Sequence, residues 1–395
     1  MSSSEVQASA SAAPASDRIA LAEPVIGGNA ARYIAECLDS NFVSSVGPYV
    51  GRFEREFADG VGVRHAVACA SGTAALHLAF HVLDIGPGDE VLVPSLTFVA
   101  SANPVLYRGA SVTLVDSEAT TLDLDPALVV EELDRRARLG LRQPAAIEVV
   151  HLVGQPASMV PILDAAQRHG ITVVEDASEA LGATWTHGTL AGRQVGSVGR
   201  IGCFSFNGNK LLTTGGGGML VTDDEGLARR ARHLSTQARL PGRTYDHDEI
   251  GYNYRLSNIA AALGVAQLEQ LPDLLAGRRR VAGRYDASLA AMTGIRPAVR
   301  PAGTAPSYWL YTAHLADDAP PRDRVLDALA ADGIDARPIW TPLHAMALFA
   351  EAPRLGGHVA DAIFDRAISL PSTSNLAPHR QDRVVASLEA ALRTA

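Results

Sequence analysis

The sequence predicts an α/β fold in which a mostly parallel sheet forms a large domain and a smaller C-terminal α+β domain follows it. Short apolar runs alternate with segments of helical spacing through the first half of the chain, which is typical of repeated βα units. The runs are apolar along most of their length, which favours strands buried on both faces. A chain of 395 residues with 47% hydrophobic content can bury a large core.

Composition excludes several functional classes. The formal net charge is −9 and no basic cluster occurs, so we expect no nucleic acid partner, although a local pocket for a phosphorylated ligand stays compatible. Cys37, Cys69 and Cys203 are widely spaced among apolar neighbours, which indicates buried thiols in a reducing compartment and no zinc site. No segment has the length of a membrane span, and residues 1–16 lack a signal-peptide pattern. We expect a disordered tail over 1–16 and a cytoplasmic protein.

The chain begins with two expected helices, 29–38 and 49–57. The loop between them contains Ser45 and Gly47; it could bind a ligand or serve as a plain connector. A short buried strand over 65–70 follows, then Ser71-Gly72-Thr73, then a helix over 74–83. This strand, turn and helix arrangement points free backbone N–H groups at an anion. Ser71 and Thr73 could equally be simple helix caps.

The alternation continues to residue 206. We expect strands at 90–94, 111–116, 146–152, 171–176 and 203–206, and helices at 95–109, 126–138 and 159–169. In parallel sheets ligands sit beyond the carboxyl ends of the strands. The segments 71–73, 95–98, 154–155, 176–179 and the loop of Lys210 should therefore converge on one site.

Three residues in those segments have side chains suited to one cofactor. Lys210 stands between a strand and four glycines, and a desolvated lysine there becomes a nucleophilic amine; the alternative is a solvent-facing lysine. Asp176 closes an apolar strand beside Glu175, so a positive partner is needed: a protonated pyridine nitrogen, an arginine or a helix-terminal amide. Phe98 offers a flat face, unless it belongs to the core.

Pyridoxal phosphate matches this set. It needs an amine for its aldehyde, a carboxylate to keep its ring nitrogen protonated, donors for its phosphate and an aromatic platform. Lys210, Asp176, the 71–73 turn and Phe98 supply one each. A helix N-terminus accepts the phosphate without extra lysines, which agrees with the acidic composition.

Eight ordered motifs extend this interpretation across the chain: GPYVGRFEREFA, ACASGTAALHLA, DEVLVPSLTFVASANPV, VHLVGQPASM, VVEDASEALGA, GCFSFNGNKLLTTGGGG, GYNYRLSNIAAALGVAQLE and PLH. From about Arg18 to the C-terminus the chain resembles the DegT/DnrJ/EryC1/StrS family of sugar aminotransferases. The resemblance implies a pyridoxal phosphate enzyme of the aspartate aminotransferase fold (fold type I), working as a homodimer with shared active sites.

The resemblance also assigns roles. Lys210 matches the lysine that binds the cofactor and moves protons, and Asp176 matches the partner of the ring nitrogen. Phe98 matches the residue that stacks on the ring. Phosphate ligands would be Gly72, Thr73 and Ser205, with Asn253 reaching across from the second subunit. Candidate substrate residues are Ser45, Gly47, Asn207, Arg255 and His344; Arg255 could instead form a structural ion pair, and His344 could be an ordinary surface or capping histidine.

Three positions depart from the family pattern. Asn207 replaces a histidine common in relatives, which excludes a proton shuttle there. Glu179 stands where a glutamine often donates to the cofactor, and Val153 stands where tyrosine is common. One related branch replaces the lysine by histidine and performs dehydration, and Lys210 argues against that branch. We take Gly215 to Gly218 as residues that let the backbone turn closely beneath the cofactor.

The second half of the chain predicts helices at 257–271, 274–292, 322–332 and 381–392 and a strand at 309–315. We place the large cofactor-binding domain at 17–272 and the small domain at 273–395.

The expected reaction transfers an amino group from an amino acid, L-glutamate, to a nucleotide-linked keto-sugar in amino-sugar and polysaccharide biosynthesis. We favour C4 of a UDP-linked, N-acetylated 4-keto-6-deoxyhexose. The alternatives are a 3-keto-sugar aminotransferase and a non-catalytic cofactor-binding sensor of the same fold. A nicotinamide-binding protein is disfavoured, because the glycine run lacks the strand-turn-helix context of a dinucleotide fingerprint.

Overall fold

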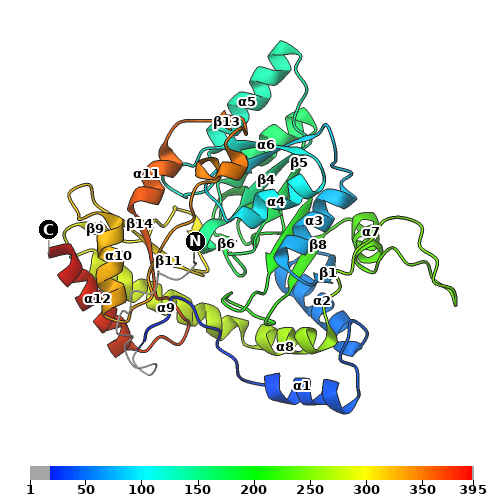
Figure 1. The fold of residues 1–395 in the computed structure, drawn as a ribbon, viewed down its shortest axis with the longest axis horizontal. Coiled ribbons are helices and arrows are strands. Elements are labelled where there is room, and N and C mark those ends of the chain that lie inside the picture. The colour runs from blue at the N-terminus through cyan, green and yellow to red at the C-terminus, as the bar shows by residue number, and fades with distance from the viewer. Residues whose placement is uncertain (1–17, 394–395) are drawn as a thin grey trace, which may run out of the picture.

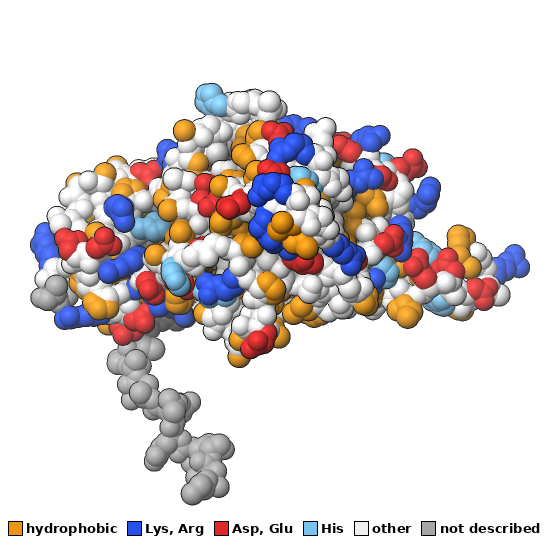
Figure 2. Space-filling model, turned by 90° about the horizontal axis from the view of Figure 1, so that it is seen from above, with side chains coloured by type: hydrophobic (Ala, Val, Ile, Leu, Met, Phe, Trp, Pro, Cys, Tyr) orange, Lys and Arg blue, Asp and Glu red, His pale blue; other side chains and the backbone are white. Residues whose placement is uncertain are grey.

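The structure is a computed structural model that describes residues 18–393. The expected tail over 1–16 lies outside the described residues. Two sheets organise the chain, and the orange and red C-terminal elements gather at one end of the molecule (Figure 1). No helix within 18–393 has the length and hydrophobicity needed to cross a bilayer. On the face seen in Figure 2, acidic and basic side chains are interspersed.

The large sheet has eight strands in the order β1-β8-β7-β5-β4-β2-β3-β13. Only β8 runs antiparallel, to both β1 and β7, so the predicted mostly parallel sheet is confirmed. The strands are β1 (His65–Cys69), β2 (Glu90–Pro94), β3 (Ser111–Val115), β4 (Ala146–Val150), β5 (Thr172–Asp176), β7 (Ile201–Ser205), β8 (Gly218–Thr222) and β13 (Arg354–Leu355).

Helices cover both faces of this sheet (Figure 1). One apolar core packs the sheet against α1 (Ala30–Asp39), α2 (Pro48–Val61), α5 (Pro126–Leu139), α6 (Met159–His169) and α8 (Asn258–Glu269). The core on the other face packs it against α3 (Gly72–Val82), α4 (Val99–Tyr107) and α7 (Glu225–Ser235). Strands buried on both faces explain the nearly continuous apolar runs of the sequence.

The C-terminal part has its own antiparallel sheet and core. The sheet order is β12-β14-β11-β9, with α10, α11, α12 and the long helix α9 nearby. The bounds are α9 (Leu271–Leu289), β9 (Ile295–Arg296), β11 (Tyr311–Leu315), α10 (Arg322–Ala331), β12 (Arg337–Pro338), α11 (Val359–Arg366), β14 (Ala367–Leu370) and α12 (Pro378–Arg393); β6 (Thr184–Trp185) pairs with β10 (Thr304–Ala305). The predicted domain boundary at 272–273 falls in the first turn of α9 and stays a prediction.

Four elements differ from the sequence prediction in ways that bear on the site or the domain boundary. The helix expected over 95–109 begins only at Val99, because Ser95 is held in an extended segment by Val115 and Leu343. Gly218 belongs to β8 and not to a glycine loop. The helix α7 was not predicted at all. Pro272 does not separate two helices by a loop; it lies in the first turn of α9, where its missing N–H costs nothing.

Candidate active site

A pocket of about 240 Å³ opens at the carboxyl ends of the strands of the large sheet. The segments expected to converge after β1, β2, β5 and β7 do so here. The pocket is lined by nine of the residues predicted to form the site: Ser71, Gly72, Thr73, Phe98, Asp176, Glu179, Ser205, Asn207 and Lys210.

Sheet register explains how the lysine loop meets the turn after β1. Strand β8 lies between β1 and β7, so Cys69, Gly218 and Ser205 stand side by side across the three strands. A Cβ at Gly218 would lie 2.4 Å from the carbonyl carbon of Ser71. Only glycine therefore allows β8 to run this close to the start of α3.

Three of the glycines in the run 215–218 are required, for different reasons. Gly215 has φ of +80°, a conformation that L side chains rarely adopt, whereas Gly216 has open space around it. At Gly217 an added Cβ would lie 2.3 Å from Thr214 Oγ1. The close turn expected over the whole run thus depends on three of the four glycines.

Lys210 has little access to solvent, since its side chain is 13% exposed. Its Nζ lies 3.5 Å from the centre of the Trp309 ring and 4.0 Å from Oε1 of Glu179. Burial lowers the pKa of Lys210, and the negative charges of Glu179 and Asp176 oppose that shift. A lowered pKa supplies more neutral amine for attack on a carbonyl.

Asp176 ends β5 and is 4% exposed. Its Oδ2 accepts from the hydroxyl of Ser101 at 2.9 Å and its Oδ1 from the N–H of Ser178 at 3.0 Å. No cationic side chain within 18–393 lies at ion-pair distance from it. Neighbouring Glu175 instead pairs with His151, whose Nε2 lies 2.9 Å from Glu175 Oε2. Asp176 is therefore open to a cation supplied by a ligand, which fits a protonated pyridine ring.

The start of α3 fits a phosphate group. Ser71 is the helix cap, and its Oγ accepts from the N–H of Ala74 at 3.0 Å. The cap and anion interpretations are compatible, because first-turn N–H groups such as those of Gly72 and Thr73 lack intrahelical acceptors. A Cβ at Gly72 would lie 2.8 Å from Cβ of Ser205, so the two segments enclose a narrow cradle.

An aromatic wall completes the pocket. Phe98 is 48% exposed, as a stacking platform requires, and its ring centre lies 4.9 Å from that of Trp340. Trp309 stacks near Trp340 at 6.3 Å. Both tryptophans come from the C-terminal part, and neither was predicted from the sequence.

Comparison with known proteins agrees with this geometry. The profile described as the DegT/DnrJ/EryC1/StrS aminotransferase family matches residues 24–389. The chain belongs to this family. It is 43% identical to a GDP-perosamine synthase of Caulobacter vibrioides, over 95% of this chain and 98% of that protein. It is 42% identical to EpsN of Bacillus subtilis, a putative pyridoxal phosphate-dependent aminotransferase, over 93% of this chain and 94% of that protein.

Solved structures show the same architecture. DesV of S. venezuelae aligns with a TM-score of 0.83 at 34% identity, covering 93% of this chain and 95% of that one. A family member from Brucella abortus aligns with a TM-score of 0.84 at 29% identity, covering 92% and 95%. The predicted fold type I architecture, aminotransferase class and pyridoxal phosphate dependence are thereby confirmed.

The sequence holds one further signal that singles out Lys210 directly. Lys210 is the only lysine in all 395 residues; arginine supplies every other strongly basic side chain. No comparable signal marks Trp309, Trp340 or Ser101, because their roles depend on contacts with segments distant in sequence.

Five predicted residues lie outside the pocket of the single chain. Ser45 and Asn253 are exposed, and Gly47 precedes α2 against Asn258. Arg255 makes the structural ion pair, with Nη1 2.9 Å from Glu54 Oε1. The side chain of His344 is 7% exposed: Nδ1 lies 2.5 Å from Ser95 Oγ and Nε2 2.8 Å from Asp361 Oδ1, so it ties the residue after β2 to α11.

The departures from the family pattern have structural correlates. Glu179 Oε2 accepts from the backbone N–H of Val153 at 2.8 Å, a contact that needs no tyrosine side chain. Burial raises the pKa of Glu179, and Lys210 opposes the shift. Asn207 faces the pocket, and its carbonyl accepts from the N–H of Lys210 at 3.0 Å.

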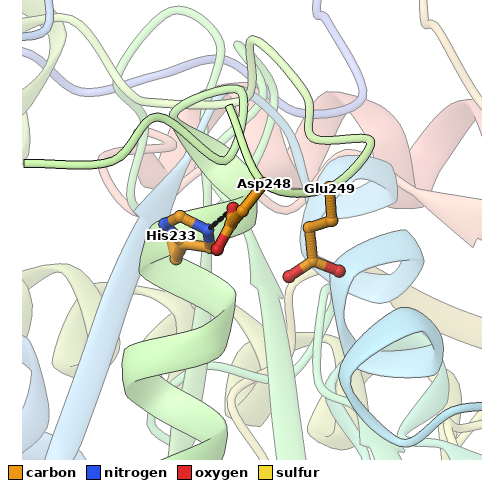
Figure 3. Close-up of side chains that lie close together, drawn as sticks. All are labelled: His233, Asp248 and Glu249. Carbon is orange, nitrogen blue, oxygen red and sulfur yellow. Dashed lines mark hydrogen bonds and ion pairs between the residues drawn. The ribbon is translucent and has the colours of Figure 1, made fainter. Parts of the chain in front are cut away.

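A separate cluster of metal-ligand type lies at the end of α7 (Figure 3). His233 Nε2 is only 2.6 Å from Asp248 Oδ1, and Glu249 lies 3.9 Å from Arg230 Nη2. These side chains already satisfy one another and Arg230, so we assign them no ligand.

Proposed function

We propose that this aminotransferase moves an amino group from L-glutamate to C4 of a nucleotide-linked 4-keto-6-deoxyhexose. The supporting observation is that one pocket holds the desolvated Lys210 and the buried carboxylate of Asp176, and that no cationic side chain among residues 18–393 lies at ion-pair distance from this carboxylate. Relatives named GDP-perosamine synthase, at 43%, 37% and 35% identity, and a dTDP-4-dehydro-sugar 4-aminotransferase at 34% support a nucleotide sugar aminated at C4.

The names of the relatives bear on which nucleotide the sugar substrate carries. The sequence led us to favour a UDP-linked, N-acetylated sugar, which stays a prediction. The names of the relatives make a GDP-linked sugar the first substrate to test. The 3-keto-sugar alternative also keeps support, because a UDP-N-acetyl-3-dehydro-glucosamine 3-aminotransferase is 38% identical over 88% of this chain.

Each residue of the pocket has a task in this proposal. Bound pyridoxal phosphate supplies an aldehyde that carries the amino group and a ring that withdraws electrons. Asp176 keeps the ring nitrogen protonated, Phe98 packs on the ring, and the first turn of α3 with Ser205 holds the phosphate. Lys210 anchors the aldehyde through Nζ. Once free, Nζ would act as the base and then the acid that moves a proton at the reacting carbon.

A second copy of the chain would complete the site. Asn253, Ser45 and Gly47 lie outside the pocket of their own chain, as residues that serve a partner's site would. The segment between α7 and α8 extends away from the body (Figure 1) and exposes Leu240, Tyr245 and Ile250. Exposed apolar side chains grouped in this way favour a protein interface.

The single lysine makes the cofactor test unusually clear. Purified protein should be yellow, and borohydride should add the reduced cofactor mass to the peptide containing Lys210. The variant Lys210→Ala should stay unlabelled. Protein that takes up no cofactor when it is added would contradict the proposal.

Substrate is tested with a panel of GDP-, UDP- and dTDP-linked 4-keto and 3-keto sugars, with glutamate as donor and amino-sugar product measured by mass spectrometry. We expect turnover of a 4-keto-6-deoxy sugar. Turnover of 3-keto sugars alone would establish the alternative enzyme, and cofactor binding without any turnover would favour the sensor.

A further inference from the structure

Two tryptophans of the C-terminal part, Trp309 and Trp340, contact the Lys210 amine or its carboxylate neighbour. Nζ lies 3.5 Å from the centre of the Trp309 ring, within the range in which a ring face attracts a cation. Oε1 of Glu179 lies 4.0 Å from the same Nζ. That oxygen also accepts a hydrogen bond from Nε1 of Trp340 at 3.0 Å. One indole thus meets the amine directly, and the other holds its carboxylate partner.

The ring of Trp309 is fixed in place. The residue is 2% exposed, and its Nε1 donates to the carbonyl of Asn209 at 2.8 Å, which ties the ring to the residue before Lys210. Its own carbonyl accepts from Nη1 of Arg278 at 2.9 Å. A Cβ at Gly154 would lie 2.8 Å from the backbone nitrogen of Trp309, so the glycine allows this close contact. These contacts hold the Trp309 ring in its position beside the amine.

Glu179 is equally constrained. Its side chain is 5% exposed, and its second oxygen accepts from the N–H of Val153 at 2.8 Å. With both oxygens bound to N–H donors, the carboxylate stays directed at Lys210. Two fixed groups therefore favour a positive charge at Nζ, while burial disfavours it.

We propose that Trp309 and the Trp340–Glu179 pair form a seat that holds the free amine of Lys210 as an ammonium between its two proton transfers. The proposal rests on the proposed function and deepens it. With the cofactor bound, Nζ would accept one proton and give one proton back at the reacting carbons, so no proton is gained or lost at Nζ. Trp309 forms no covalent bond; it is a positioning residue that keeps the charged amine beside the reacting carbons.

The test measures the pKa of the Lys210 amine. Full-length protein freed of cofactor is treated with acetic anhydride at a series of pH values, and acetylation of Lys210 is followed by mass spectrometry. Because the chain has one lysine, the N-terminal amine is the only other amine and serves as an internal reference. The midpoint of the pH profile reports the pKa, whereas the plateau at high pH reports access of the reagent.

We expect Trp309→Leu to move the midpoint to lower pH and to raise the acetylation rate near neutral pH about tenfold, which corresponds to a shift of about one unit. Trp309→Phe should give a smaller shift in the same direction, because a phenyl ring attracts cations less strongly than an indole. Trp340→Phe, which loses the donor to Glu179, should also lower the midpoint. Trp185→Phe is the matched control: its indole donates to Ala157, outside the pocket, and the midpoint should not move.

The outcomes distinguish a failure of the seat proposal from a failure of the proposed aminotransferase function. If borohydride fixes the cofactor to Lys210 but neither Trp309→Phe nor Trp309→Leu moves the midpoint, the seat is wrong and the aminotransferase proposal stands. A change in plateau alone also refutes the seat, because it reports access only. If Trp309→Leu prevents folding, Trp309→Phe and Trp340→Phe decide whether the seat shifts the midpoint, with circular dichroism as the check of folding. In the cofactor-loaded enzyme the seat further predicts that Trp309→Phe lowers kcat more than it changes KM, relative to wild type.

Discussion

At the scale of single residues, the pocket separates two adjacent carboxylates into different roles. Glu175 and Asp176 both end β5, yet alternation along the strand sends them to opposite faces of the sheet. Glu175 is satisfied by His151 and by the N–H groups of Gly196 and Val198. Asp176 has only a hydroxyl and one N–H. The unequal set of partners identifies which carboxylate is available to a cationic ligand.

Asp176→Asn tests that assignment. Asparagine keeps the size and can still accept from Ser101, but it loses the charge that meets the ring nitrogen. Breaking a buried ion pair costs about 3–5 kcal/mol, so we expect kcat/KM to fall by about 10²- to 10⁴-fold. The measurement is steady-state turnover together with the absorption spectrum of the bound cofactor. Unchanged turnover would remove Asp176 from the mechanism.

Glu148 of β4 makes a different prediction at this scale. It is fully buried, and neither oxygen has a hydrogen-bond partner among residues 18–393. Burial raises its pKa well above the ordinary value, and Asp176 adds to the shift. The folded state therefore holds a proton that the unfolded state releases, so stability falls as pH rises above the ordinary carboxyl pKa. Glu148 destabilises the protein at neutral pH.

We expect Glu148→Leu to raise the free energy of unfolding by about 1–3 kcal/mol at neutral pH, because it removes an unsatisfied buried carboxyl. The gain should shrink as pH falls toward 4. Glu148→Gln is the control: it remains polar but cannot titrate, so it should flatten the pH dependence with a smaller gain. Thermal unfolding of the three proteins at pH 5 and pH 8 measures this. A Leu variant less stable than wild type at pH 8 would refute the argument.

At the scale of elements, β8 brings the loop of Lys210, the proposed cofactor lysine, beside the proposed phosphate site at the start of α3. The strand pairs with β1 on one side and β7 on the other, which places the turn before α3 beside the loop of Lys210. This junction depends on the absence of a side chain at Gly218. A loop-like glycine run in the sequence thus ends in a central strand, because hydrogen bonds from both neighbours outweigh the weak strand propensity of glycine.

Gly218→Ala tests the junction. The added methyl group would collide with the backbone of Ser71, so we expect a loss of about 1–3 kcal/mol in unfolding free energy and weaker cofactor binding. Gly216→Ala is the matched control for stability, since nothing lies within 4 Å of its added Cβ. Urea unfolding compares the two variants, and cofactor titration compares Gly218→Ala with wild type, because Gly216 itself lines the pocket. Equal behaviour of the two would show that β8 tolerates a shift away from Ser71.

At the scale of the whole molecule, the proposed homodimer divides each site between two chains. A mixture of Lys210→Ala and Asn253→Ala subunits, refolded together, should regain activity that neither variant has alone. Each hybrid dimer would contain one site with an intact Lys210 and an intact Asn253 from the other subunit. Turnover after mixing, with the separately refolded variants as controls, measures this recovery. No recovery, despite a hybrid dimer detected by native mass spectrometry, would contradict sharing through Asn253.

Local patterns explain how much of the fold and site could be predicted. Strand β2 and helix α6 were predicted with their observed bounds, because apolar periodicity follows burial directly. The turn after β1, Asp176 and Lys210 were predicted to converge because parallel strands share a carboxyl edge. The missed helix α7 and the shortened helix α4 lie where partners distant in sequence decide the conformation.

The sequence by itself determined the mostly parallel character of the sheet, most of its covering helices, the cofactor and the residues placed at strand ends, because these follow from periodicity, chain order and motif. Only the tertiary structure brought Trp309 to Lys210, Trp340 to Glu179 and His344 to Ser95. The hydrogen bonds that fix these contacts join residues far apart in the sequence: 100 residues for Trp309 and Asn209, 161 for Trp340 and Glu179, and 249 for His344 and Ser95. The physical reason is that local periodicity records whether a residue is buried. It does not record which distant side chain it meets there, and packing alone decides that.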